Sequence, residues 1–157
     1  MKILIVGIVA SGKTTLARKL SKLLDIKHYE IDSVVHDDIN KIKRSEKEQK
    51  KIFKEINRED NWIIEGTLRQ HLFYLCEMAD KIIYLDIPLK VRKRRIFIRF
   101  VRQLFGIEKC NYTVNLKMLK LMYKWTNDFE NNRMDFEEKL FTYRDKIIIV
   151  NDNKLML

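Results

Sequence analysis

Short apolar runs alternate with longer amphipathic stretches along this chain, and the alternation predicts its fold. Five runs are apolar enough and of the right length to be buried strands, and they cover residues 2–6, 28–31, 61–65, 81–86 and 146–150. Between them, apolar residues recur at helical spacing at 13–24, 45–60, 68–77, 89–105, 114–130 and 134–143. Strands that alternate with helices predict βαβ units, and therefore an α/β fold with a parallel sheet covered by helices on both faces.

Two of the expected helices carry apolar stripes that we expect to face the core. In the helix at 89–105 the stripe consists of Val91, Ile98, Val101 and Phe105. In the helix at 114–130 it consists of Leu116, Met118, Leu119, Met122 and Trp125. The helix at 45–60 opens with Ser45 and Glu48, which have the spacing of a capping box.

No internal repeat or domain boundary interrupts this pattern, so we expect residues 1–157 to form a single domain. Glycine and proline are scarce, which argues against long flexible linkers. Residues 106–113 (GIEKCNYT) lie between two long helices and form the loosest part of the pattern. We expect this segment to act as a hinge or a lid.

The strongest chemical signal lies between the first strand and the first helix. Residues 7–15 are GIVASGKTT, which match the phosphate-loop pattern G-x-x-x-x-G-K-[ST] in the required strand–loop–helix context. Glycines let the backbone turn its N–H groups inward, and the helix start adds its positive dipole end. We expect ATP phosphates to be bound by Gly7, Ala10, Ser11, Gly12, Lys13, Thr14 and Thr15. Lys13 would reach the β- and γ-phosphates, and the Thr14 hydroxyl would bind Mg²⁺.

Composition narrows the partners. The net charge is +10, which implies an anionic partner such as a nucleotide, a nucleic acid or an acidic membrane surface. No apolar stretch reaches the roughly 18 residues of a membrane-spanning helix, and we expect no membrane partner. The two cysteines, Cys76 and Cys110, form no motif, which favours a cytoplasmic protein with reduced thiols. An N-K-x-D element is missing from the sequence, which argues against a GTPase.

The third expected strand continues into a second motif. Residues 62–69, WIIEGTLR, resemble the D-G-x-P-R element of adenylate-kinase-type enzymes. Along nearly its whole length the chain resembles topology modulation proteins, small P-loop proteins of the same kinase-like superfamily. The shared features are the phosphate loop, an aspartate at Asp32, W-[IV]-I-[DE]-G at 62–66, A-D-x-I-I-x-L-D-x-P at 79–88, and arginines at Arg95 and Arg99.

This resemblance implies an architecture and several roles. It implies a three-layer sandwich of the P-loop nucleoside-kinase type, with a five-stranded parallel sheet in the order 2-3-1-4-5. Glu65 would then end near Lys13 and Thr14, where a carboxylate supports Mg²⁺ through water. Arg69 corresponds to the arginine that contacts the substrate phosphate.

Asp32 follows the second expected strand (HYEID), directly before an expected helix. Ligands of open α/β sheets bind at the carboxyl ends of the strands, so Asp32 is a candidate to orient an acceptor hydroxyl or take its proton. Alternatively, Asp32 only caps the following helix.

Residues 90–102 (KVRKRRIFIRFVR) are strongly basic and contain no acid. On a helix, four arginines form one stripe, namely Arg92, Arg95, Arg99 and Arg102. The resemblance implies that Arg95 and Arg99 clamp the phosphates and stabilise charge during transfer. A solvated basic face and a contact to a nucleic-acid backbone are the alternatives.

Together these features predict a small-molecule kinase that uses ATP and Mg²⁺. The acceptor of the γ-phosphoryl group would be a nucleotide, a nucleoside or another metabolite with a hydroxyl group. Catalysis would rest on positioning and charge stabilisation, through Lys13, Asp32, Arg69, Arg95 and Arg99. The alternative is a nucleotide-dependent DNA- or RNA-binding, topology-modulating protein without small-molecule kinase activity.

Overall fold

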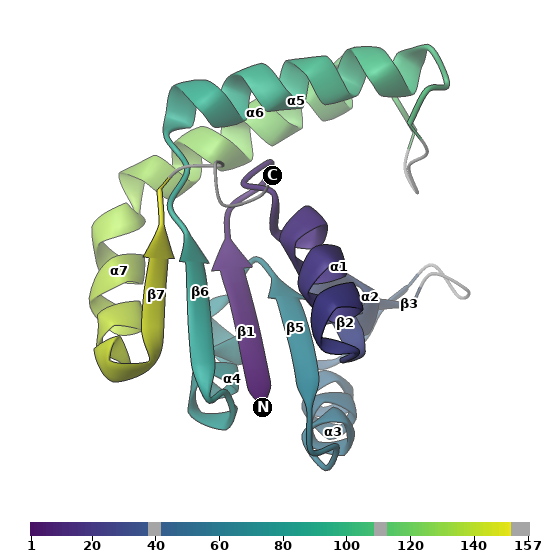
Figure 1. Ribbon diagram of the computed structural model, residues 1–157. Coiled ribbons are helices and arrows are strands. Elements are labelled where there is room, and N and C mark those ends of the chain that lie inside the picture. Colours follow the sequence, from purple (N-terminus) through teal and green to yellow (C-terminus); the bar gives the residue numbers. More distant parts are fainter. Residues whose placement is uncertain (38–41, 109–112, 152–157) are drawn as a thin grey trace.

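All five expected strands form in the computed structural model, and they lie side by side in one parallel sheet (Figure 1). The structure describes residues 1–37, 42–108 and 113–151. The strands are β1 (Lys2–Gly7), β2 (His28–Glu30), β5 (Trp62–Gly66), β6 (Lys81–Leu85) and β7 (Ile147–Val150). Their order is β2-β5-β1-β6-β7, which is the expected 2-3-1-4-5 when these strands are numbered along the chain.

The helices follow the predicted stretches closely. The long ones are α1 (Lys13–Leu24), α3 (Glu46–Ile56), α5 (Leu89–Leu104), α6 (Leu116–Asn131) and α7 (Arg133–Phe141). The stretch expected at 68–77 divides into a 3₁₀ turn η1 (Gln70–Leu72) and α4 (Tyr74–Met78), and a second turn η2 (Arg144–Lys146) precedes β7. The capping box of α3 is confirmed, because Ser45 and Glu48 cap each other's backbone N–H groups.

The central strand β1 is buried on both faces, as its continuous apolar run predicts. Leu4 and Val6 face a large core formed with α2 (Ile31–Val35), α3, α4 and α7. Ile3 and Ile5 face a smaller core formed with α1. This arrangement confirms the three-layer α/β architecture (Figure 1).

The second strand is shorter than expected, and this corrects the placement of Asp32. β2 ends at Glu30, and Asp32 is the second residue of a short helix α2 (Ile31–Val35), so it neither ends the strand nor caps the helix. The chain turns at this point because Ile31 packs fully buried beneath Gly66, where a Cβ would lie 2.6 Å from the Cβ of Ile31. A small antiparallel ribbon that the sequence did not predict follows α2, formed by β3 (His36–Asp37) and β4 (Ile42–Lys43).

Helices α5 and α6 pack on each other above the carboxyl end of the sheet (Figure 1). The predicted core stripe of α5 is wrong: Val91, Ile98 and Phe105 are 37%, 42% and 74% exposed. The buried residues of α5 are instead Arg92, Ile96 and Gln103. α5 is therefore rotated so that its apolar stripe faces outward.

The stripe of α6 is partly as expected. Leu119 and Met122 are buried against Ile96 of α5, while Leu116 and Trp125 are exposed.

The segment 106–113, expected as a hinge or lid, is described only in part. Residues 109–112, which include Cys110, lie outside the described residues. Cys76 is a buried free thiol. None of the described helices is long and apolar enough to cross a membrane.

Candidate active site

The phosphate loop closes through a turn that glycine adopts easily. Gly12 has φ 98° directly before α1, in the left-handed region. Gly7 has no room for a side chain, because a Cβ there would lie 2.7 Å from the Ser11 hydroxyl oxygen. Ala10 also takes a left-handed conformation, with φ 61°. Since α1 begins at Lys13, the amino end of that helix faces the loop, as phosphate binding requires.

A hydroxyl and a carboxylate meet at the edge of the loop. The Oγ1 of Thr14 donates a hydrogen bond of 2.6 Å to the Oε1 of Glu65, which lies near the end of β5. Parallel pairing of β1 and β5 brings them together, with Val6 opposite Gly66 and Ile5 opposite Glu65. The expected neighbourhood of these side chains is thus present in the structure.

These oxygen atoms fit a hard cation such as Mg²⁺, which prefers few protein ligands together with water and phosphate oxygens. No group of three or more His, Cys, Asp or Glu side chains among the described residues could hold a metal alone. A magnesium ion here would therefore need the nucleotide phosphates as ligands. When bound, it would neutralise phosphate charge beside Thr14 and Glu65.

Burial perturbs both charged groups of this site. Burial raises the pKa of Glu65 above its ordinary value, although the hydrogen bond from Thr14 and the charge of Lys13 oppose the shift. Burial also lowers the pKa of Lys13, against the attraction of Glu65 and Asp32. The Lys13 ammonium donates a 3.0 Å hydrogen bond to the Ile8 carbonyl across the loop. An anionic ligand would offset the desolvation of this ammonium.

The two arginines expected to clamp the phosphates lie in different settings. Arg95 donates from Nη1 to the carbonyl oxygens of Ala10 and Ser11, each at 3.2 Å, so α5 contacts the loop directly. Arg99 is 43% exposed and pairs with Glu108 at 3.0 Å. The structure therefore brings Arg95 to the phosphate loop and leaves Arg99 near it, engaged with its own helix end.

On the other side of the loop, Asp32 and Arg69 approach each other. The Nη2 of Arg69 lies 3.6 Å from a carboxylate oxygen of Asp32, which is 69% exposed. The Nη1 of Arg69 is buried and has no hydrogen-bond partner in the part of the chain that the structure describes. Asp32 and Arg69 thus place a carboxylate beside a guanidinium whose Nη1 makes no hydrogen bond among the described residues.

One further arginine supports this side and was missed by the sequence analysis. The Nη1 of Arg44 donates to three carbonyl oxygens, those of Ser33, Val34 and His36, at 2.9 to 3.0 Å. It thereby fixes the end of α2 and the start of the ribbon. These hydrogen bonds could not be predicted from the sequence, because Arg44 lies in a polar stretch that looks like an ordinary solvated loop.

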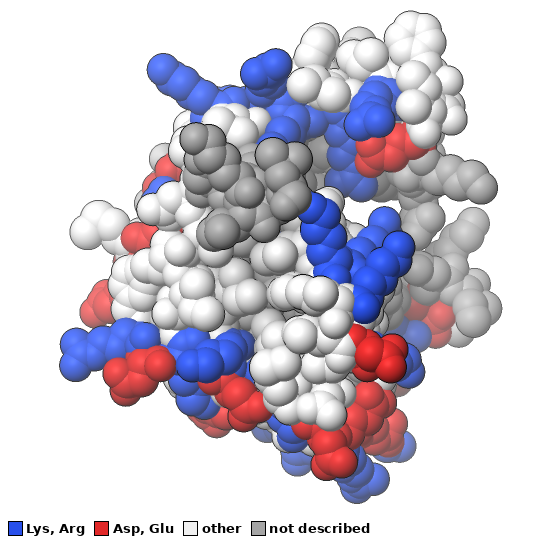
Figure 2. Space-filling model, viewed as in Figure 1, with Lys and Arg blue, Asp and Glu red and all other residues white. Residues whose placement is uncertain are grey.

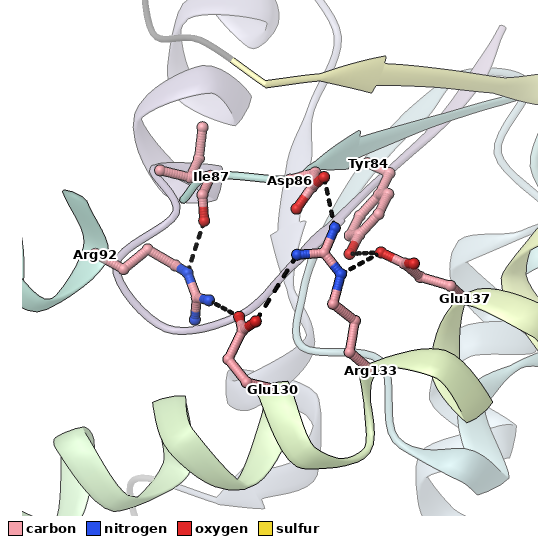
Figure 3. Close-up of polar contacts among 7 residues, drawn as sticks. All are labelled: Tyr84, Asp86, Ile87, Arg92, Glu130, Arg133 and Glu137. Carbon is pink, nitrogen blue, oxygen red and sulfur yellow. Dashed lines mark hydrogen bonds and ion pairs between the residues drawn. The ribbon is translucent and has the colours of Figure 1, made fainter. Parts of the chain in front are cut away.

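A buried ionic network at the base of α5 and α6 was also missed (Figure 3). Arg92 is 1% exposed, donates from Nε to the Ile87 carbonyl at 2.8 Å, and pairs with Glu130 of α6. Arg133 of α7 pairs with the same carboxylate and also with Asp86, at 2.7 Å, just after β6. This network ties the paired helices to the end of the sheet.

Solved structures of small-molecule kinases share this fold at low sequence identity. A shikimate kinase from Bacteroides thetaiotaomicron matches with a TM-score of 0.62 and 16% identity, over 99% of this chain and 88% of that one. A shikimate kinase from Acinetobacter baumannii in complex with shikimate matches with a TM-score of 0.61 and 15% identity, over 98% and 84%. A deoxyadenosine kinase from M. mycoides with bound dATP matches with a TM-score of 0.55 and 17% identity, over 99% and 95%. No curated protein sequence matches the chain.

The sequence also matches one protein-family model. The model is described as an AAA domain and covers residues 3–99, from β1 into α5, which is more than half of the 157 residues. The matched part contains the phosphate loop, Glu65 and Arg95. The narrower resemblance to topology modulation proteins stays a prediction. The chain therefore belongs to the AAA-domain family of P-loop NTPases and has a small P-loop kinase-like fold.

Proposed function

We propose that this protein binds ATP with Mg²⁺ and transfers the γ-phosphoryl group to a small acceptor that carries a hydroxyl and an anionic group. The observation that carries this proposal is the Asp32–Arg69 pair, which lies at the same edge of the sheet as the phosphate loop. A protein that only bound a nucleotide would not need a carboxylate and a half-satisfied guanidinium beside that loop.

On the nucleotide side, Lys13 would bind the β- and γ-phosphates, with the loop from Gly7 to Thr15 around them. Thr14 and Glu65, whose side chains touch, would place the metal. Arg95 already contacts the loop and would stabilise charge on the transferred group, and Arg99 would join it by leaving Glu108.

On the acceptor side, the acceptor oxygen attacks the γ-phosphorus as the bond to the β–γ bridging oxygen breaks, and ADP leaves. The hydroxyl proton passes to Asp32, whose exposure leaves room for an acceptor. The guanidinium of Arg69, which is 36% exposed and faces Asp32, would bind the anionic group of the acceptor, which fits a nucleotide or a hydroxy acid better than an uncharged nucleoside.

We also propose that the protein is cytoplasmic, that residues 1–157 form one domain, and that the chain is related to topology modulation proteins.

The test is a coupled assay for ADP release with a panel of nucleoside monophosphates, nucleosides and hydroxy acids. We expect release that depends on one acceptor class and disappears in Lys13→Ala, while Lys54→Ala, which changes an exposed lysine of α3, keeps wild-type rates. Arg69→Lys should raise the KM for the acceptor while leaving the KM for ATP unchanged. If no acceptor in the panel gives turnover although ATP binds, the kinase proposal is wrong.

The alternative from the sequence is nucleic-acid binding, and the uncompensated charge of +10 favours it. The two functions separate in one pair of measurements. Duplex DNA binding through the basic surface should weaken steeply with salt and survive Lys13→Ala, whereas phosphoryl transfer should not survive it.

A further inference from the structure

The outward side of α5 combines exposed apolar residues with basic ones, and we call it the outer face of α5. Six of its members are apolar and three are basic: Val91, Phe97, Ile98, Val101, Leu104, Phe105, Lys90, Arg94 and Arg102. At about 100° per residue these positions fall within roughly half of the helix circumference. Phe97, Leu104 and Phe105 are 53%, 58% and 74% exposed, far more than a core-forming stripe allows.

This face points away from the nucleotide site. The opposite side of α5 packs near the phosphate loop through Ile96, which lies near Val9, and Arg95, on the flank between the two sides, donates hydrogen bonds to Ala10 and Ser11. Phe97 and Ile98 lie away from that side, so a nucleotide bound at the loop would not cover them.

The positive charge of this face indicates what kind of partner it can bind. α5 contains no acidic residue. Among the described residues, Lys90, Arg94 and Arg102 take part in no ion pair with a carboxylate. A second copy that met this face with its own would oppose like charges, so the partner must be anionic and also accept apolar side chains.

We propose that the outer face of α5 docks on an anionic lipid surface. The stretch from Lys90 to Phe105 is about 22 Å long at the helical rise, and α5 runs along the upper edge of the molecule (Figure 1). In Figure 2 this upper edge carries blue and white side chains, with the white ones gathered toward the end of α5. Ile107, just beyond the end of α5, and Leu116, the first residue of α6, are also exposed, at 68% and 66%.

A lipid surface fits these residues better than a nucleic acid does. Most of the apolar side chains are aliphatic, so they cannot stack on bases but can insert among acyl chains. The three basic side chains have long stems that let their charges reach lipid phosphates while their carbons stay in the apolar layer. The sequence analysis expects no membrane partner because no apolar stretch is long enough to span a membrane, and it separately expects this stripe in the core.

The test is sedimentation of the full chain with vesicles of phosphatidylcholine, with and without about 30% phosphatidylglycerol. We expect binding to the anionic vesicles only. The double variant Phe97→Ser/Phe105→Ser should weaken it about tenfold, and Arg94→Glu should weaken it similarly. Met134→Ser and Lys139→Glu, which change an apolar and a basic residue exposed on α7, should leave binding unchanged.

Thermal unfolding confirms that each variant is folded before its binding is compared. Lys13→Ala should bind vesicles as the wild type does, which keeps this proposal separate from the kinase proposal. Absence of binding to anionic vesicles overturns it, and so does binding that depends on salt but not on Phe97 and Phe105. A loss of oligonucleotide binding or of self-association in the α5 variants, without a change in vesicle binding, assigns the face to another partner.

Discussion

Replacing Glu130 by Gln tests the view that the buried network at the base of α5 stabilises the fold. Arg92 is 1% exposed, and its Nη1 already has no hydrogen-bond partner among the described residues. Glu130 is the carboxylate that pairs with it, and Gln keeps the shape of that side chain without its charge. The variant therefore leaves a buried guanidinium without a counter-ion.

Removing one member of a buried pair costs about 3–5 kcal/mol. Glu130 is 27% exposed, so solvent screening places the expected cost at the lower end, about 3 kcal/mol. For a chain of this length, that loss corresponds to roughly 6–12 °C in Tm. Urea denaturation followed by circular dichroism measures the free energy of unfolding directly.

The reasoning also predicts an asymmetry. Arg92→Met removes the buried charge itself, so Glu130→Gln should cost at least about 2 kcal/mol less in the Arg92→Met background than in the wild type. Glu138→Gln on α7 is the matched control, since Glu138 is exposed and makes no ion pair among the described residues. A cost below about 1 kcal/mol for Glu130→Gln, or an equal cost in both backgrounds, would refute the argument.

Three further changes test other parts of the structure. Ser45→Ala removes the side-chain cap of α3 and should lower the free energy of unfolding by about 1 kcal/mol; an unchanged denaturation midpoint would contradict the capping geometry. Gly66→Ala should cost about 1–3 kcal/mol by the same measurement, because its Cβ would overlap Ile31, whereas Gly106→Ala meets no atom within 4 Å and should cost only the backbone strain of its φ of 69°, about 1 kcal/mol. Glu65→Gln should raise the Tm of the ligand-free protein at neutral pH. Burial raises the pKa of Glu65 in the folded protein above its ordinary value of 4.5, so the wild type loses stability as pH rises from 4.5 through that higher pKa, and the Gln variant does not. The difference in Tm should vanish as pH falls below that window, and a variant less stable than the wild type at neutral pH would contradict the sign.

The sequence predicted the sheet and the phosphate loop because both depend on local signals. The continuous apolar run of β1 requires burial on both faces, and the loop motif requires a helix start at Lys13. Glu65 could be placed beside Thr14 because the strand order follows from the resemblance and is confirmed. The chemical roles of these residues stay predictions until turnover is measured.

The face of α5 could not be predicted for a physical reason. Helical periodicity showed two stripes on that helix, one basic and one apolar, and burial of the apolar stripe is the general expectation. The desolvation of the buried Arg92 charge is offset by Glu130, which lies 38 residues further along the chain and so cannot be inferred from local periodicity. The shortened β2 has a similar origin, because Ile31 turns inward to fill the space that Gly66 leaves.

The rotation of α5 links the two proposals. A helix turns by about 100° per residue, so fixing Arg92 against Ile87 and Glu130 also fixes the direction of every other side chain on it. Arg95, three residues on, is thereby directed at the phosphate loop, and Phe97 and Ile98 are directed outward. Had the apolar stripe been buried, Arg95 would point away from the loop. The exposed apolar face is therefore the structural consequence of bringing an arginine to the nucleotide site, and docking on lipid would cover what that arrangement leaves exposed.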